Sequence, residues 1–266
     1  LPISPSRVAS HSVRESHGPS LFLVTPFLWR PLMHGQSSPS PPTSIHIKWE
    51  TATPGPCVVT GADASQQDLL PFWFNRLRRW NPQVPVVFAD FGLTEAARCW
   101  CQHRGIVRSI PKISNRKSWF SKPLAILAAG YEQIVWLDAD MEVQADISPL
   151  WGELFPASGL GTTHDGSPPG KNPPGFINSG LVVARHGLNF IAVWAKACLT
   201  APVRGDQEVL YALGARCNLP QTYNHVRQLP NREQAKVVHW WGDDGKAELR
   251  WRLRVGATGN PTDSPA

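Results

Sequence analysis

The stretch Ile134-Val-Trp-Leu-Asp-Ala-Asp140 decides the predicted fold, because a short apolar run ends in two carboxylates separated by one small residue. It follows Pro123-Leu-Ala-Ile-Leu-Ala-Ala-Gly130, in which an early proline and a late glycine match the preferences of helix starts and ends. A helix that leads into a buried strand is half of a βαβ unit. Ligands bind outside the carboxyl ends of strands in open α/β sheets, so a binding site is expected at Asp138 and Asp140.

The segments around this stretch alternate between strand and helix patterns. Strands are predicted at 57–63, 84–90, 105–110, 134–138, 177–184 and 237–241, and helices at 66–80, 94–103, 119–129, 188–199 and 206–213. Thr94 and Asp206 are the predicted N-caps of their helices, and Pro71 is tolerated only in a first turn. The Gly- and Pro-rich segment 159–175 is predicted to be a long surface loop. This alternation predicts a single α/β domain with a largely parallel sheet.

Composition divides the chain into three parts. Residues 1–45 are rich in Ser, Pro, His and Arg and are predicted to be a disordered extension. Residues 46–250 form the predicted domain, and residues 251–266 the predicted tail. The alternating segment Arg250-Trp-Arg-Leu-Arg-Val255 is interpreted as a solvated edge or a contact for an acidic surface.

Charge and cysteine content limit the classes of protein that fit. A net charge of +6 suits nucleotide phosphates, acidic glycans or an anionic membrane face, whereas scattered basic residues predict no nucleic-acid partner. No apolar stretch approaches the roughly 20 residues that span a bilayer. Residues 21–29 are interpreted as unstructured or as a weak surface anchor, so a cytoplasmic location is expected, with peripheral membrane association left open. Five cysteines without C-x-x-C spacing predict reduced, mostly buried thiols.

Asp138 and Asp140 have the spacing of two ligands for one hard cation. Side chains at i and i+2 of an extended segment share a face, so the carboxylates converge if the strand continues through Ala139. Two carboxylates and a few waters suit Mg²⁺ or Mn²⁺. An isolated D-x-D is more often a pair of solvated acids at a turn, but its position after a buried strand favours the metal site.

The chain from about Cys57 to Lys246 resembles the GT-A glycosyltransferases, and it is most similar to the glycogenin-like family 8, whose members use nucleotide-sugar donors. Four pieces stand in the family's order: Val59-Thr-Gly-Ala-Asp63; Ile134 to Asp140; Phe176-Ile-Asn-Ser-Gly-Leu-Val-Val183 with Gly205-Asp-Gln207; and His239-Trp-Trp-Gly242 followed by Lys246. The last piece departs from the family, because one extra residue precedes Lys246 and Ala247-Glu248 replaces Pro-Trp. The resemblance implies a Rossmann-like GT-A domain with a mostly parallel sheet flanked by helices.

The resemblance also implies a role for each matching residue. The metal ligands would be Asp138, Asp140 and His239, and the imidazole favours Mn²⁺ over Mg²⁺. The catalytic residues would be Asp206 and Gln207, where an acid or amide stabilises an oxocarbenium-like charge. The residues that contact the donor would be Thr60, Gly61, Asp63, Lys122, Asn178, Ser179, Gly180, Gly242 and Lys246.

Some of these residues have an ordinary structural interpretation as well. A histidine beside two tryptophans is more often a packed residue than a ligand, and an average lysine such as Lys122 is solvated. Asp206 serves equally well as a helix N-cap. Asn178 to Gly180 could be a strand feature in which glycine only permits close backbone approach.

The predicted function is a metal-dependent, retaining transfer of a hexose from a nucleotide diphosphate sugar, a UDP-sugar by the resemblance, to a glycan, lipid or protein acceptor. Two alternatives stay open. Phosphohydrolases of the haloacid-dehalogenase type also place D-x-D after a hydrophobic strand, although Glu142 stands where that pattern has Thr or Val. The second alternative is a non-catalytic protein that binds nucleotide sugars or carbohydrates with the same fold.

Overall fold

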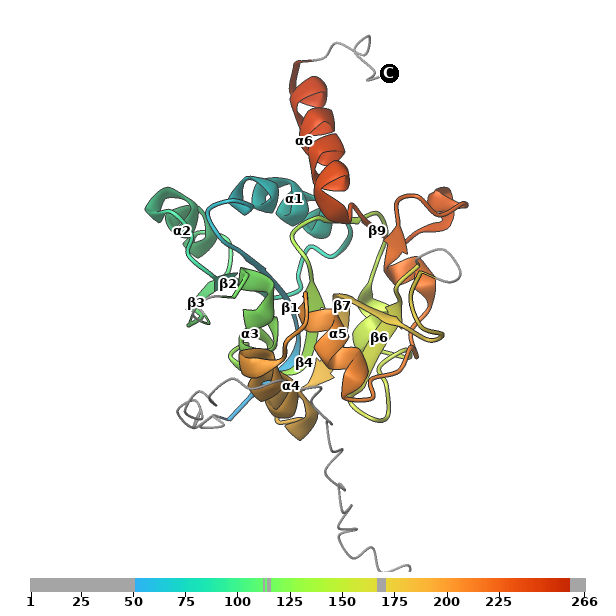
Figure 1. The fold of residues 1–266 in the computed structure, drawn as a ribbon. Helices are drawn as coiled ribbons and strands as arrows, with labels where there is room; N and C mark the ends of the chain where they lie inside the picture. Colours follow the sequence, from blue (N-terminus) through green and yellow to red (C-terminus); the bar gives the residue numbers. More distant parts are fainter. Residues whose placement is uncertain (1–50, 112, 114–115, 167–170, 259–266) are drawn as a thin grey trace, which may run out of the picture. The chain divides into compact units, whose positions relative to one another are not determined.

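The computed structural model describes residues 51–111, 113, 116–166 and 171–258 (Figure 1). The predicted extension over residues 1–45 and the apolar segment 21–29 lie outside these residues. The described chain builds a six-stranded sheet in the order β3-β2-β1-β4-β7-β6. Its strands are β1 (Thr53–Ala62), β2 (Val86–Asp90), β3 (Ile106–Ser109), β4 (Tyr131–Leu137), β6 (Leu160–His164) and β7 (Ile177–Arg185).

Five of the six strands run in one direction. The pairs β1–β2, β2–β3 and β1–β4 are parallel, whereas β7 is antiparallel to both of its neighbours, β4 and β6. The predicted α/β fold with a mostly parallel sheet is therefore confirmed. The predicted loop at 159–175 is wrong in its first part, because β6 forms there. Thr162 pairs with Val182 of β7, and both residues are fully buried. β6 is therefore stabilised by its pairing with β7, which the local composition does not reveal.

Helices cover both faces of the sheet (Figure 1). Val58 packs into one core with Trp73 of α1 (Leu70–Trp80) and Cys101 of α2 (Glu95–Gln102). Its neighbour Val59 packs into a second core, on the opposite face. That second core is closed by α3 (Lys122–Leu127), α4 (Asn189–Thr200) and α5 (Asp206–Ala212). A strand buried on both faces explains the continuous apolar runs of the sequence.

A second, three-stranded sheet in the order β5-β9-β8 joins distant parts of the chain. It consists of β5 (Met141–Val143), β8 (His225–Val226) and β9 (Val237–His239). β9 is antiparallel to β5 and pairs His239 with Met141. The helix α6 (Gly242–Thr258) follows directly, and short 3-10 helices are η1 (Gln67–Leu69), η2 (Ser118–Ser121), η3 (Ser148–Trp151), η4 (Gln221–Tyr223) and η5 (Arg232–Gln234).

The helix ends agree with the sequence at two positions and differ at others. Pro71 lies in the first turn of α1, and the Thr94 hydroxyl caps α2 by accepting from the Ala97 N–H. The predicted N-cap role of Asp206 is wrong, because Gly205 is the N-cap and Asp206 is the first helical residue. The predicted helix at 119–129 is η2 followed by the shorter α3.

The predicted division at residue 250 falls inside α6. Arg250 makes two hydrogen bonds of 2.6 and 2.9 Å to the Asp68 carboxylate, so it contacts an acid of the same chain. The outer limits of the domain stay a prediction.

All five cysteines are free, and Cys57, Cys101 and Cys198 are buried. Cys99 is exposed and Cys217 is half-buried, so the prediction of reduced, mostly buried thiols is confirmed. Within residues 51–258 as described, no helix combines the length and the apolar character that crossing a bilayer requires.

Candidate functional site

The two aspartates stand on a turn at the end of β4. The strand ends at Leu137, the Asp138 N–H donates to the Gly180 carbonyl at 2.9 Å, and the Met141 N–H donates to the Asp138 carbonyl at 3.0 Å. The extended continuation through Ala139 is therefore wrong. The two carboxylates still approach one point across this turn. β5 begins directly after Asp140 and pairs with β9, and this pairing fixes where the turn lies.

His239 completes a cluster of three ligand atoms. The pairing of Met141 with His239 places the ring beside Asp140, so its Nε2 lies 3.3 Å from Asp140 Oδ1 and 4.0 Å from Asp138 Oδ2. One ligand atom from each of the three residues lies within 4.8 Å of the others. Two carboxylates and an imidazole nitrogen fit Mn²⁺ or Mg²⁺, with the imidazole favouring the transition metal.

Gly180 makes room for this histidine. A Cβ at Gly180 would collide with ring atom Cε1 of His239 and would lie 2.8 Å from the Asn178 amide oxygen. The glycine on β7 therefore permits close packing of β7 against the end of β9. The interpretation of Gly180 as a close-approach position is confirmed, while its contact with a donor stays a prediction.

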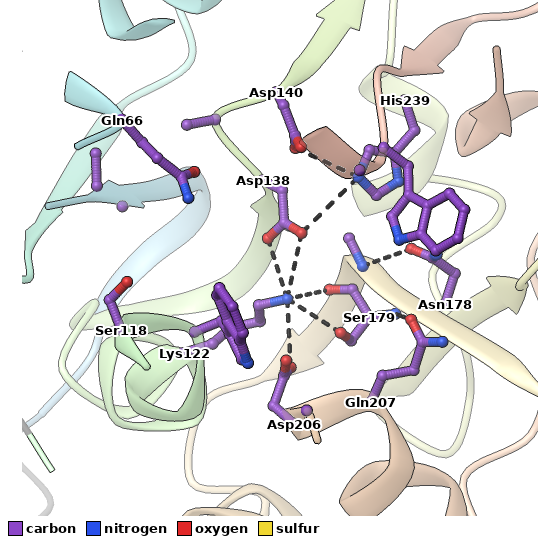
Figure 2. A pocket seen from close by; sticks show the side chains of 18 of the residues that line it. Gln66, Ser118, Lys122, Asp138, Asp140, Asn178, Ser179, Asp206, Gln207 and His239 are labelled. Atoms are coloured by element: carbon purple, nitrogen blue, oxygen red, sulfur yellow. Dashed lines mark hydrogen bonds and ion pairs between the residues drawn. The ribbon is translucent and has the colours of Figure 1, made fainter. Parts of the chain in front are cut away.

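Lys122 lies between two carboxylates in the interior of the site (Figure 2). Its ammonium is 3.0 Å from Asp138 Oδ1 and 3.3 Å from Asp206 Oδ2, and it donates to the Ser179 carbonyl at 2.9 Å. With a side chain only 2% exposed, it is not the solvated lysine of the alternative interpretation. Burial alone would lower the pKa of Lys122, but the Asp138 and Asp206 carboxylates outweigh it and raise the pKa above its ordinary value.

Asp206 and Gln207 enter the site from the first turn of α5. Burial raises the pKa of Asp206, and the Lys122 ammonium opposes that shift. The Gln207 amide is held at both ends, since its oxygen accepts from the Ser179 N–H at 3.3 Å and its nitrogen donates to Asp165 Oδ1 at 2.9 Å. The N-terminus of α5 thus presents an acid and a fixed amide to the same space.

Asp63 lines the site directly after the end of β1. Its Oδ2 accepts from the Ser118 hydroxyl at 2.8 Å, and its Oδ1 accepts from the Ser65 N–H at 2.9 Å. A Cβ at Gly61 would clash with the Phe91 ring, which explains the small residue there. The polar turn after β1 is therefore a fixed wall of the site.

The segment after His239 forms the start of α6. Gly242 has a positive φ of 81°, a conformation that favours glycine. Lys246 lies in the first turns of the helix, and its ammonium is 2.7 Å from Asp140 Oδ2. Burial alone would raise the pKa of Asp140, but the His239 ring in its protonated form and the Lys246 ammonium outweigh it and lower the pKa. Despite the extra residue in the sequence, the lysine therefore reaches the second carboxylate of the D-x-D pair, Asp140.

These groups line one cleft of about 420 Å³ (Figure 2). Thirteen of the fourteen predicted site residues line it; the exception is Thr60, which is fully buried. Sequence reasoning missed several lining residues, which are Gln66, Ser118, Trp119, Arg204 and Trp241. It also missed Asn224 and Asp165, two buried residues that support the cleft from behind. Trp241 stands inside the quoted segment 239–242 but was given no role, and the others belong to no recognised motif, because the fold places them beside the cleft.

Several solved glycosyltransferases are similar in structure to this chain. The galactosyltransferase LgtC, solved with donor and acceptor sugar analogues, aligns with a TM-score of 0.53 and 16% identity over 78% of this chain and 97% of that one. GlyE of Streptococcus pneumoniae aligns with a TM-score of 0.57 and 15% identity over 73% of this chain and 56% of that one. A glycosyltransferase involved in glycosylation of the major capsid of PBCV-1 aligns with a TM-score of 0.52 and 14% identity over 73% of this chain and 98% of that one.

At these identities the likeness establishes the fold. The predicted GT-A glycosyltransferase fold is confirmed, whereas membership of family 8 stays a prediction. No protein-family model matches the chain, and no curated protein matches it either.

Proposed function

We propose that this chain is a metal-dependent glycosyltransferase that moves a hexose from a nucleotide diphosphate sugar to a glycan, lipid or protein acceptor. The observation that carries the proposal is the convergence of Asp138, Asp140 and His239 in the cleft of a chain with a GT-A fold. Mn²⁺ suits this ligand set best, and UDP is the nucleotide that the sequence resemblance favours.

The charges of the cleft suit a diphosphate donor. Lys246, at 18% exposure, is the cation nearest to Asp140 that solvent can reach, so it can exchange its carboxylate partner for a phosphate oxygen. Arg204 also lines the cleft. A metal held by Asp138, Asp140 and His239 would neutralise the charge that develops on the departing diphosphate.

The part of the cleft around Asp206 and Gln207 suits the transferred sugar. Asp206 and the oriented amide of Gln207 present oxygen atoms to the cleft beside Ser179, and such oxygens stabilise a positive charge that grows on the anomeric carbon. Lys122 holds Asp206 and Asp138 in place through ion pairs of 3.3 and 3.0 Å. We propose retention of the anomeric configuration by the same family resemblance.

The decisive experiment measures nucleotide binding and turnover together. Donor hydrolysis and transfer are assayed across a panel of nucleotide sugars with Mn²⁺, for the wild type and for Asp140→Asn. Asp146→Asn is the matched control, since Asp146 is an exposed acid of the same segment outside the cleft. We expect turnover in the wild type and the control, and none in Asp140→Asn.

Other outcomes distinguish the alternatives. Absence of both turnover and Mn²⁺-dependent nucleotide binding in the wild type would refute the proposal. Hydrolysis of phosphate esters would favour a phosphohydrolase, and nucleotide-sugar binding without turnover would favour a non-catalytic binding protein. The cytoplasmic location and peripheral membrane association stay predictions from the sequence.

A further inference from the structure

We propose that Asn224 is a positioning residue for His239: it holds the ring proton on Nδ1 and so leaves the Nε2 lone pair facing Asp138 and Asp140. The inference rests on the proposed function in one respect, because it takes His239 as a metal ligand. Asn224 is fully buried between η4 and β8, and it does not line the cleft itself. Its influence on the cleft therefore passes through the histidine.

The orientation of a neighbouring amide, Asn178, is fixed by groups that can act in only one way. The Gly180 N–H donates to Asn178 Oδ1 at 2.8 Å, and a backbone N–H can only donate. At its other end, Asn178 Nδ2 donates to the Asp165 carboxylate at 3.3 Å. The atom that Asn178 turns toward Gly180 is consequently the amide oxygen.

That oxygen in turn fixes the orientation of Asn224. Asn224 Nδ2 donates to Asn178 Oδ1 at 2.9 Å and to the Thr163 hydroxyl at 2.8 Å. Because both hydrogens of the amide nitrogen are used there, the amide oxygen is the atom that faces the histidine. Asn224 Oδ1 lies 2.9 Å from His239 Nδ1, and an amide oxygen can only accept, so Nδ1 carries a proton.

The proton on Nδ1 decides the state of the other ring nitrogen, Nε2. With Nδ1 protonated, the neutral ring has its lone pair on Nε2, which lies 3.3 Å from Asp140 Oδ1. In Figure 2 the His239 ring lies between the Asp140 carboxylate and Asn178. A lone pair and the carboxylate oxygens then face the same space, which is an arrangement that binds a cation. Metal-ligating histidines commonly donate their second N–H to such a partner, and loss of the partner costs about 10- to 100-fold in metal affinity or activity.

The direct test is nitrogen-15 NMR of the histidine rings in the wild-type chain without metal. In alkaline buffer we expect His239 to show a solvent-protected proton on Nδ1 and an unprotonated Nε2. His239→Gln identifies the signal by removing it. A neutral ring with its proton on Nε2, or exchanging between both nitrogens, would overturn the proposal without any Asn224 variant having to fold.

Variants then test the effect on metal binding, measured as Mn²⁺ affinity by electron paramagnetic resonance. Asn224→Leu removes the acceptor, and we expect Mn²⁺ binding to weaken by about 10- to 100-fold. Asn224→Asp keeps an oxygen for Nδ1–H but loses the N–H that Asn178 Oδ1 accepts, so we expect it to retain the Nδ1–H form and to weaken Mn²⁺ binding less than Asn224→Leu does. Thr163→Val is the matched control, since it removes a buried partner of Asn224 but leaves Asn224 Oδ1 on the histidine.

The outcomes separate this proposal from the proposed function. If the wild type binds no Mn²⁺ but His239 carries its proton on Nδ1, the metal-dependent function fails and the positioning by Asn224 stands. If Thr163→Val weakens Mn²⁺ binding as much as Asn224→Leu, general loosening of the core explains the effect and the role of Asn224 in metal binding is overturned.

Discussion

Replacement of Lys122 by methionine tests the electrostatic centre of the site. Methionine keeps an unbranched chain of similar length but removes the charge that lies 3.0 Å from Asp138 and 3.3 Å from Asp206. At an effective dielectric constant of about 20, each attraction is about 5 kcal/mol before the cost of desolvation. Removing one partner of a buried ion pair costs about 3–5 kcal/mol, because a buried charge is left uncompensated. Asp138 is 27% exposed, so we expect a loss near the lower limit, about 3 kcal/mol.

The sign of the pH dependence follows from Asp206. Its pKa is already raised by burial, and losing Lys122 raises it further. Between the unfolded and folded pKa values the native state binds more protons, so stability falls as pH rises. The deficit of Lys122→Met should therefore be largest above the folded pKa of Asp206 and should shrink as the pH falls toward the unfolded value.

The assay is urea unfolding followed by tryptophan fluorescence at neutral and mildly acidic pH, without metal. Lys246→Met is the control from the same cleft, because Lys246 is more exposed than Lys122 and pairs with one carboxylate rather than two. We expect the control to lose less stability than Lys122→Met. An equal loss in the two variants, or a Lys122→Met deficit that does not shrink in acid, would refute the reasoning.

Three further predictions concern other parts of the chain. Gly180→Ala should weaken Mn²⁺ binding, because its Cβ would displace His239; titration of Mn²⁺ checks this, and unchanged affinity would contradict it. Thr94→Ala should cost about 1 kcal/mol in urea unfolding, since it removes the acceptor of the Ala97 N–H, and a neutral result would show that the cap is not formed. Thiol labelling of the native chain should modify exposed Cys99 first and spare Cys57, whose burial raises its pKa, so early labelling of Cys57 would contradict the packing.

Regular elements of the fold were largely predictable from sequence. The strands at 134–138 and 177–184 are apolar runs, and both form with limits close to the predicted ones, as β4 (Tyr131–Leu137) and β7 (Ile177–Arg185). The direction of β7 was not predicted, and β6 was missed altogether. Both depend on which strands pair, and pairing is decided by packing between distant segments rather than by local propensity.

Two residues of the site also depart from the structural role that their residue type favours. Asp206 has the residue type of an N-cap, yet Gly205 takes that position and Asp206 turns toward Lys122 instead. Lys122 has the residue type of a solvated side chain, yet it is among the most buried in the described chain. In both cases a tertiary contact outweighs the preference of the residue type.

The sequence by itself determined where the acidic pair lies, because an apolar strand followed by Asp138 and Asp140 is a local pattern that needs no partner to be recognised. Only the tertiary structure decided what surrounds that pair. The β5–β9 pairing delivers His239, the start of α6 delivers Lys246, and Asn224 holds the ring from behind. These residues lie more than 80 positions beyond Asp140 in the chain, and long-range packing is what brings them to one cleft.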